Sequence, residues 1–272
     1  MSAQTERAAR FLALHRPQSP LLLPNPWDTG TARILASLGF EALATTSSGY
    51  AVSTGGLDGS LTREEAISHA STIVAATELP VSADLENGFA DDAEGVAHTI
   101  HLALGAGLAG CSIEDYTRRA EAPIYGRSHA AERVAAAAEA AHGGAAHLVL
   151  TARAENYLHG RPDLADTIAR LQAYQEAGAD VLYAPGLTSH EDIRLLVSSV
   201  DRPVNVLALP GVPPVSALAE LGVSRISVGG GFAFAALGGL VEAANELLSA
   251  GTYAFLERAA LGSRTARAAL GG

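Results

Sequence analysis

The feature that most constrains this chain is a repeated alternation of short apolar runs with longer segments of helical periodicity. Eight runs rich in aliphatic residues fit strands, at 21–23, 42–45, 80–84, 110–114, 147–152, 180–184, 203–207 and 225–228. Amphipathic segments separate them, and one of these begins at Thr62 with Glu65 as its capping-box partner. Strands separated by helices run parallel, and eight such units are enough to close a barrel.

We therefore predict that residues 1–272 form one (β/α)8 TIM-type barrel domain. A short helix at 4–15 would precede the barrel, and helices at 232–249 and 252–261 would extend from its C-terminal end. The glycine-rich segment at 46–59 is expected to be a long loop. A doubly wound open sheet is the structural alternative, but no G-x-G-x-x-G motif follows the first strand, so the barrel is favoured.

Charge and residue usage exclude several classes of protein. The formal net charge is −11, and a protein that binds the phosphate backbone of nucleic acid needs a basic surface, so no nucleic-acid partner is expected. No uninterrupted apolar run reaches the roughly 18 residues that a membrane span needs, and the N-terminus lacks a signal-peptide apolar region. We therefore expect a cytoplasmic protein without a membrane partner. Cys111 is the only cysteine, which excludes an internal disulfide and a cysteine-based zinc cluster.

A missing residue type limits the chemistry further. All 18 basic residues are arginine, and the chain contains no lysine. A lysine Schiff base, which makes an electron sink from a carbonyl without a metal, is therefore impossible, and so is the lysine-dependent P-loop. If the protein acts on a carbonyl compound, a metal ion or an arginine must polarise it.

Acidic residues collect where neighbouring strands are expected to end, which is the face where barrel enzymes place their active sites. Asp84 and Glu86 close the third predicted strand, and residues two apart in a strand face the same side. Glu114 closes the next strand. Carboxylates crowded in this way are costly unless a cation neutralises them, and hard divalent cations prefer oxygen ligands. The sequence thus predicts an Mg²⁺ or Mn²⁺ site formed by Asp84, Glu86 and Glu114.

The same rim offers groups that could hold a substrate. An arginine such as Arg153 can bind a carboxylate through two hydrogen bonds, and the backbone of a serine–glycine turn can bind another. The ligand that fits is a small 2-oxo acid, whose carboxylate and carbonyl oxygens chelate the metal so that an enolate is stabilised. Alternatively, Arg153 is a structural partner of Glu155. The candidate substrate-binding residues are Trp27, Ser47, Ser48, Gly49, Tyr50, Asp84, Arg153 and Asn205.

Several of these residues lie in motifs that resemble the isocitrate lyase/phosphoenolpyruvate mutase superfamily. The resemblance extends over about residues 20–250. The similar segments, in chain order, are Asn25-Pro26-Trp27-Asp28, Ser48-Gly49-Tyr50 with Asp58, Ala83-Asp84-Leu85-Glu86-Asn87-Gly88, Ile113-Glu114-Asp115 and Ala152-Arg153-Ala154-Glu155.

The resemblance implies a modified barrel whose last helix is exchanged between subunits, giving a homodimer or a dimer of dimers. It also implies Mg²⁺ near Asp84, Glu86 and Glu114, with a 2-oxo-acid unit held by Ser48-Gly49 and Arg153. On the same grounds, the candidate catalytic residues are Asp58, Arg153 and Glu155.

The sequence departs from the family pattern at the catalytic loops. The usual D-x-D-x-G-x-G signature has Glu86 as its second acid here, and the segment 116–121 replaces the K-[KR]-C-G-H loop of isocitrate and methylisocitrate lyases. The K-x-x-x-K-x-N-S loop of phosphonopyruvate-type members is also missing. Loop 116–128 is expected to close over the site, where Arg118 and Arg119 would face either substrate or solvent.

We therefore predict an Mg²⁺-dependent lyase acting on a small 2-oxo or 2-hydroxy acid. It would cleave a carbon–carbon bond or decarboxylate its substrate through a metal-stabilised enolate. The alternatives are a phosphonopyruvate-type enzyme acting on a phosphorus–carbon bond, and a non-catalytic protein that binds 2-oxo acids.

Overall fold

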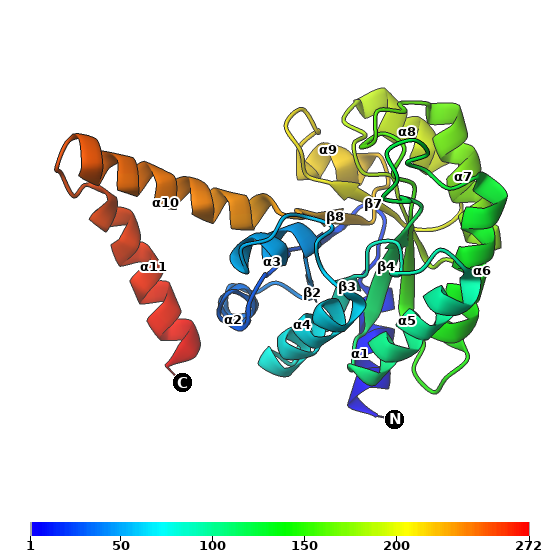
Figure 1. The fold of residues 1–272 in the computed structure, drawn as a ribbon, viewed down its shortest axis with the longest axis horizontal. Coiled ribbons are helices and arrows are strands. Elements are labelled where there is room, and N and C mark those ends of the chain that lie inside the picture. Colours follow the sequence, from blue (N-terminus) through cyan, green and yellow to red (C-terminus); the bar gives the residue numbers. More distant parts are fainter. Residues whose placement is uncertain (1, 272) are drawn as a thin grey trace.

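The computed structural model describes residues 2–271, and its eight strands run parallel with helices packed around them (Figure 1). The strands hydrogen-bond in the order β1-β8-β7-β6-β5-β4-β3-β2, and the amide of Ala44 donates to Pro24 O at 3.0 Å across the remaining gap. The predicted (β/α)8 barrel is confirmed. The strands are β1 (Leu21–Leu23), β2 (Leu43–Ala44), β3 (Val81–Asp84), β4 (Gly110–Glu114), β5 (Val149–Arg153), β6 (Val181–Tyr183), β7 (Val204–Leu207) and β8 (Arg225–Ser227).

The helices mostly begin where the sequence places capping residues. Thr62 and Glu65 form the expected capping box on α4, and Asp28 caps α2. The helices are α1 (Ala3–Ala13), α2 (Thr29–Ser37), α3 (Ser47–Ser53), α4 (Arg63–Ala76), α5 (Ala93–Gly105), α6 (Arg127–His142), α7 (Leu164–Glu176), α8 (His190–Ser198), α9 (Val215–Glu220), α10 (Gly231–Ser249) and α11 (Phe255–Leu270). The prediction of a loop over 46–59 is wrong in its first half, which forms α3. Helix α11 extends beyond residue 261, where it was predicted to end.

The barrel interior has two distinct layers below its mouth. The lower layer is apolar and is closed by α1, whose Phe11 is fully buried among strand residues. Gly110 makes this possible, because a Cβ there would lie 2.6 Å from Cε1 of Phe11. The layer above it is polar. It contains Ser82, Ser112, Thr151, Asn205 and Arg225.

Helices α10 and α11 project away from the barrel (Figure 1). α11 turns back and packs beside α2, but none of its side chains is buried. On α10, Ala233 is the only buried residue. Large apolar side chains are exposed along both helices and the turn between them, at Phe232, Phe234, Leu240, Val241, Leu247, Leu248, Tyr253, Leu256, Leu261 and Leu270.

Of the described helices, α10 is the one whose length and apolar composition would suit a membrane crossing. Two acidic residues, Glu242 and Glu246, interrupt its apolar sequence. Glu242 pairs with Arg258 of α11 at 2.9 Å, and Glu246 accepts the hydroxyl of Thr252 at 2.6 Å. Charged contacts of this kind are costly inside lipid, so they argue against a membrane span.

Candidate active site

A cavity of about 180 Å³ opens at the C-terminal ends of the strands. Six of the predicted site residues line it, namely Ser47, Ser48, Asp58, Asp84, Arg153 and Asn205. The position agrees with the general rule for barrel enzymes. Helix α3 brings the two serines to the rim because Thr46 caps it, accepting the amide of Gly49 at 3.2 Å.

Three predicted substrate-binding residues, Trp27, Gly49 and Tyr50, lie outside the lining of this cavity. Tyr50 stacks on the imidazole of His69 with ring centroids 3.8 Å apart, and Nε2 of His69 lies 3.0 Å from Trp27 O. Gly49 is buried and its amide is already used by Thr46. Its role is therefore geometric, because a Cβ there would lie 2.6 Å from Cγ2 of Thr46.

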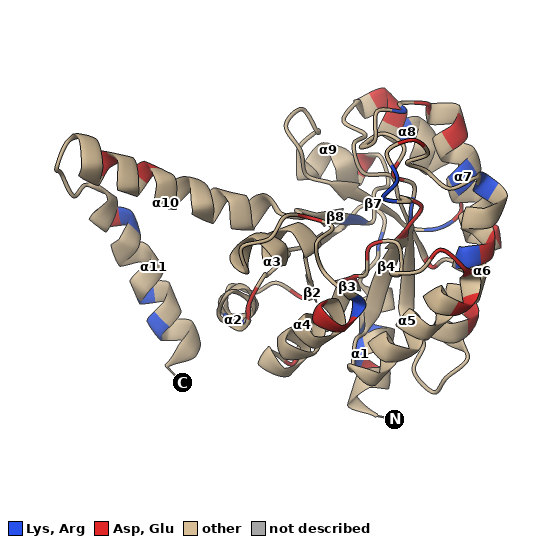
Figure 2. Cartoon of the chain, in the orientation of Figure 1, with Lys and Arg blue, Asp and Glu red and all other residues tan. Residues whose placement is uncertain are grey.

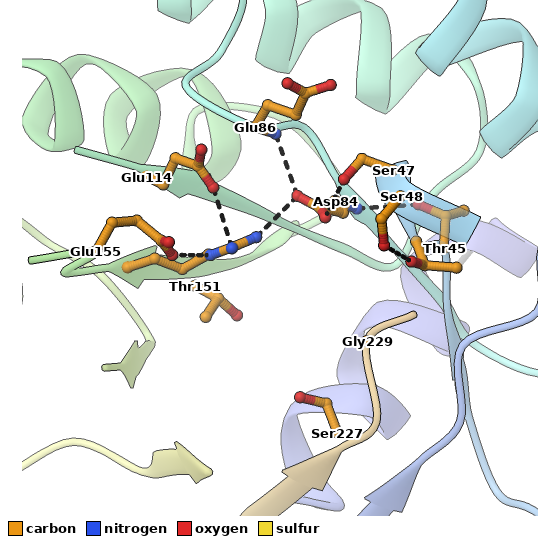
Figure 3. Close-up of polar contacts among 12 residues, drawn as sticks. Thr45, Ser47, Ser48, Asp84, Glu86, Glu114, Thr151, Glu155, Ser227 and Gly229 are labelled. Atoms are coloured by element: carbon orange, nitrogen blue, oxygen red, sulfur yellow. Dashed lines mark hydrogen bonds and ion pairs between the residues drawn. The ribbon is translucent and has the colours of Figure 1, made fainter. Parts of the chain in front are cut away.

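Arg153 pairs with three carboxylates at the cavity mouth, those of Asp84, Glu114 and Glu155, which Figure 3 shows close together. Its NH1 donates to Asp84 Oδ1 at 2.9 Å, and its NH2 lies 3.1 Å from Glu114 Oε2. Its Nε donates to Glu155 Oε1 at 2.8 Å. Glu114 and Arg153 are paired positions of adjacent strands, so the β4–β5 register itself brings them together. The guanidinium therefore holds three carboxylates in place. This supports the alternative that Arg153 is a structural partner of Glu155.

Glu86 does not join this cluster in the structure. Its φ of 47° is left-handed, and its carboxylate points away from Asp84 (Figure 3) toward the guanidinium of Arg118. Its second oxygen, Oε1, is buried and has no hydrogen-bond partner. Burial, and next the charge of Asp84, raise the pKa of Glu86 to about 7, although Arg118 opposes the shift. Arg118 thus faces an acidic side chain of the protein.

The donor set at the mouth fits a hard divalent cation. Burial raises the pKa of Glu114 well above its usual range despite the neighbouring Arg153, and Glu86 has the unpartnered oxygen. A cation at these oxygens would stabilise the ionised form of Glu114 and would give the buried oxygen of Glu86 a partner. Within the described residues, however, three ligand-type atoms lie within 4.8 Å of one another only at His142, His147 and Asp180, at the opposite end of the barrel. Asp84, Glu86 and Glu114 are therefore neighbours that do not converge to that distance.

A second network fixes the position of Glu155. Its amide donates to Asp115 Oδ1 at 2.8 Å, and Asp115 Oδ2 accepts the hydroxyl of Tyr174 at 2.6 Å and NH1 of Arg170 at 3.1 Å. The two donors come from α7, and the sequence analysis did not identify them. The only signal in the sequence is that Arg170 and Tyr174 lie four residues apart and so share a face of that helix.

Glu86 makes a pH-dependent contribution to stability that can be measured. Because the pKa of Glu86 is raised in the folded state, its ionised side chain destabilises the metal-free protein above about pH 7. This destabilisation disappears as the pH falls toward the pKa that Glu86 has in the unfolded chain. We expect Glu86→Gln to raise the free energy of unfolding by about 1–3 kcal/mol at pH 8 and by almost nothing at pH 4.5. Urea denaturation in EDTA at both pH values measures this. Glu139→Gln, at an exposed position of α6, is the control, and an equal gain at both pH values would refute the assignment.

Sequence and structure comparisons identify the family of the chain. A profile described as phosphoenolpyruvate phosphomutase matches residues 11–248 of the chain. The chain belongs to this family. It is thereby placed in the isocitrate lyase/phosphoenolpyruvate mutase superfamily that the motifs at the strand ends resemble.

Individual relatives are similar to the chain over most of its length. A crystal structure of a "putative lyase/mutase" from Burkholderia cenocepacia J2315 is 53% identical, with a TM-score of 0.91, over 94% of this chain and 92% of that one. An uncharacterised protein of Mycobacterium tuberculosis (strain CDC 1551 / Oshkosh) is 32% identical over 80% of this chain and 81% of its own length. The 2-methylisocitrate lyase of Halalkalibacterium halodurans is 31% identical over 74% of this chain and 67% of its own length.

Proposed function

We propose that this phosphoenolpyruvate phosphomutase family member is an Mg²⁺-dependent carbon–carbon lyase acting on a small 2-oxo or 2-hydroxy acid. The observation that carries the proposal is the cluster of Asp84, Glu114 and Glu155 around Arg153 at the barrel mouth. The similarity to a 2-methylisocitrate lyase supports the reaction class. Mn²⁺ is an alternative cation with the same preference for oxygen ligands.

The residues at the cavity mouth would have the following roles. Asp84, Glu86 and Glu114 would hold the cation, which when bound acts as a Lewis acid on the substrate carbonyl. Arg153 orients Asp84 and Glu114 and presents positive charge to the substrate carboxylate. The hydroxyl of Ser48 lines the cavity and can donate to the same carboxylate, whereas that of Ser47 already donates to Asp58 Oδ1 at 2.8 Å.

A proton must also be exchanged during formation and discharge of an enolate. Asp58 lines the cavity and is within 2.8 Å of Ser47 Oγ, and it makes no contact with Arg153 among the described residues. It is therefore a carboxylate available to the substrate. Glu155 is buried beside Arg153 and does not line the cavity, and burial raises its pKa although Arg153 opposes this, a direction that favours the protonated carboxyl group of a general acid.

A substrate screen tests the proposal. Purified protein is incubated with isocitrate-like acids, malate-type acids, oxaloacetate and phosphonopyruvate, each with Mg²⁺ and with excess EDTA. We expect cleavage or decarboxylation of at least one carbon acid, with loss of at least 95% of the activity in EDTA. Phosphate release from phosphonopyruvate would favour phosphorus–carbon chemistry. Metal-dependent binding without turnover would favour the non-catalytic alternative, and turnover that survives EDTA would exclude the proposed metal role.

We further propose that α10 and α11 form a contact with another subunit, giving a homodimer or a dimer of dimers. Figure 2 shows α10 almost without charge apart from Glu242 and Glu246, and its exposed apolar side chains have no cover within the chain. We expect light scattering to give at least twice the monomer mass. Val241→Glu with Leu248→Glu should shift the protein toward monomer, whereas Arg194→Glu, at an exposed position of α8, should not. A monomeric wild-type protein would contradict the proposal.

A further inference from the structure

We infer that Arg225 marks an anion subsite inside the barrel, below Arg153, which takes a second carboxylate of the substrate. The inference rests on the proposed function for the other end of the substrate, the 2-oxo or 2-hydroxy acid unit held at the rim. It adds that a dicarboxylic acid is favoured over a monocarboxylic acid of the same length.

Arg225 is a buried cation whose partners are all neutral. Its side chain lies in β8, and the residue is only 4% exposed. Its Nε donates to Asn205 Oδ1 at 2.9 Å, and its NH2 donates to Thr151 Oγ1 at 3.1 Å. Its NH1 lies 3.1 Å from His15 Nε2. A guanidinium carries five N–H groups, so two are left over after these three contacts.

His15 supplies no negative charge to this network. Burial, and next the charge of Arg225, lower the pKa of His15 to about 3, so its imidazole is neutral at physiological pH. Its Nδ1 lies 2.9 Å from Phe11 O, which assigns the ring proton to Nδ1 and leaves Nε2 to accept from Arg225. Burial lowers the pKa of Arg225 itself to about 10, so it stays charged at neutral pH.

The charge of Arg225 is therefore uncompensated within the described residues, and no carboxylate lies within ion-pair distance of it. A buried charge without a counter-ion is strongly unfavourable. Arg153 differs from Arg225 in this respect, because three carboxylates surround it in the same barrel. Arg133 is also buried without an acidic partner, but it donates to the carbonyls of Asn87, Ala90 and Glu114 and does not line the cavity.

The cavity connects the two arginines. Barrel interiors are usually filled by bulky branched side chains, whereas this cavity is lined, besides Leu23 and Leu207, by small or polar side chains, among them Ser82, Ser112, Asn205 and Ser227. The cavity that results is lined by both Arg153 and Arg225 and has a volume of about 180 Å³. A substrate held at the rim can therefore reach Arg225 with its other end, where a carboxylate would neutralise the buried charge.

Matched ligands test this in the Mg²⁺-loaded full chain. Two stable pairs differ only by a terminal carboxylate in place of a methyl group: malate with 2-hydroxybutanoate, and 2-oxoglutarate with 2-oxopentanoate. Calorimetry should show at least one dicarboxylate binding about tenfold or more tightly than its monocarboxylate partner, the effect expected of charge-assisted hydrogen bonds. Equal affinities in both pairs would overturn the inference and leave the proposed function standing. Failure of all four ligands to bind would instead count against the proposed function on which the inference rests.

Arg225→Met should abolish the preference by weakening the dicarboxylate about tenfold while leaving the monocarboxylate within twofold. Arg225→Lys should keep part of the preference because it keeps the charge, and Arg194→Met, at an exposed position of α8, should change nothing. A preference that persists in Arg225→Met overturns the inference. If that variant does not fold, a crystal of the wild-type protein with the preferred dicarboxylate decides. The second carboxylate within hydrogen-bond distance of Arg225 supports the subsite, and any other position of that carboxylate refutes it.

Discussion

Replacing Arg153 with methionine is expected to lower the free energy of unfolding by about 3–5 kcal/mol at pH 8 and to lower kcat by about 10²–10³-fold. The substitution leaves Asp84, Glu114 and Glu155 close together with no cation among them, and removing one partner of a buried charge cluster costs about this much. Burial already raises the pKa values of Glu114 and Glu155 with Arg153 present, so both values should rise further without it.

The pH dependence separates this explanation from a simple packing defect. Raised pKa values mean that the penalty is greatest when the carboxylates are ionised and is lost as the pH falls through them. Urea denaturation of Arg153→Met at pH 8 and pH 5 should therefore show a smaller deficit at pH 5. Added Mg²⁺ should restore part of the stability at pH 8. Arg194→Met is the control, and a deficit that is the same at both pH values would show that lost packing, not charge, is responsible.

Much of the fold could be predicted because its signals are local. Eight aliphatic runs separated by capped amphipathic segments identify the barrel without any knowledge of distant contacts. Helix α3 was missed because Thr46-Ser47-Ser48-Gly49 is also typical of a turn, and only the hydrogen bond from Gly49 to Thr46 shows that it begins a helix. The extent of α11 was missed because the helix has no large apolar residue between Leu261 and Leu270 that would continue the helical pattern.

The candidate site shows where reasoning from local pattern fails. Asp84 and Glu86 were expected to share a face because strand residues alternate, but β3 ends at Asp84 and the left-handed conformation of Glu86 breaks the alternation. The site still includes Glu86 as a neighbour of Asp84, whose carboxylate accepts the amide of Glu86 at 3.2 Å.

Arg225 illustrates a different gap. It lies inside a predicted strand, and a charged residue at an inward position of a barrel strand is itself unusual. Its partners could not be inferred, because His15 and Thr151 lie 210 and 74 residues away along the chain. The sequence therefore contains the anomaly, and only the fold shows that it has no acidic partner.

The largest expected effect on activity alone is that of Asp84→Asn. The amide keeps the shape of the side chain and can still accept from Arg153 or Ser47, so we expect the free energy of unfolding to change by less than about 1 kcal/mol. It removes the negative charge that would bind the cation. Loss of a Lewis acid that contributes several kcal/mol to the transition state should lower kcat about 10³-fold.

Two measurements on Asp84→Asn distinguish a metal ligand from a residue that only positions Arg153. A ligand role predicts that Mg²⁺ affinity falls at least tenfold by calorimetry and that excess Mg²⁺ restores part of the activity. A positioning role predicts unchanged Mg²⁺ affinity, with Arg153→Met and Asp84→Asn giving the same loss of activity and the double variant no further loss. Asp201→Asn, in the loop before β7, is the matched control and should behave as wild type. Because Arg153 contacts Asp84 directly, the double variant also shows whether the carboxylate acts through the cation or through the guanidinium.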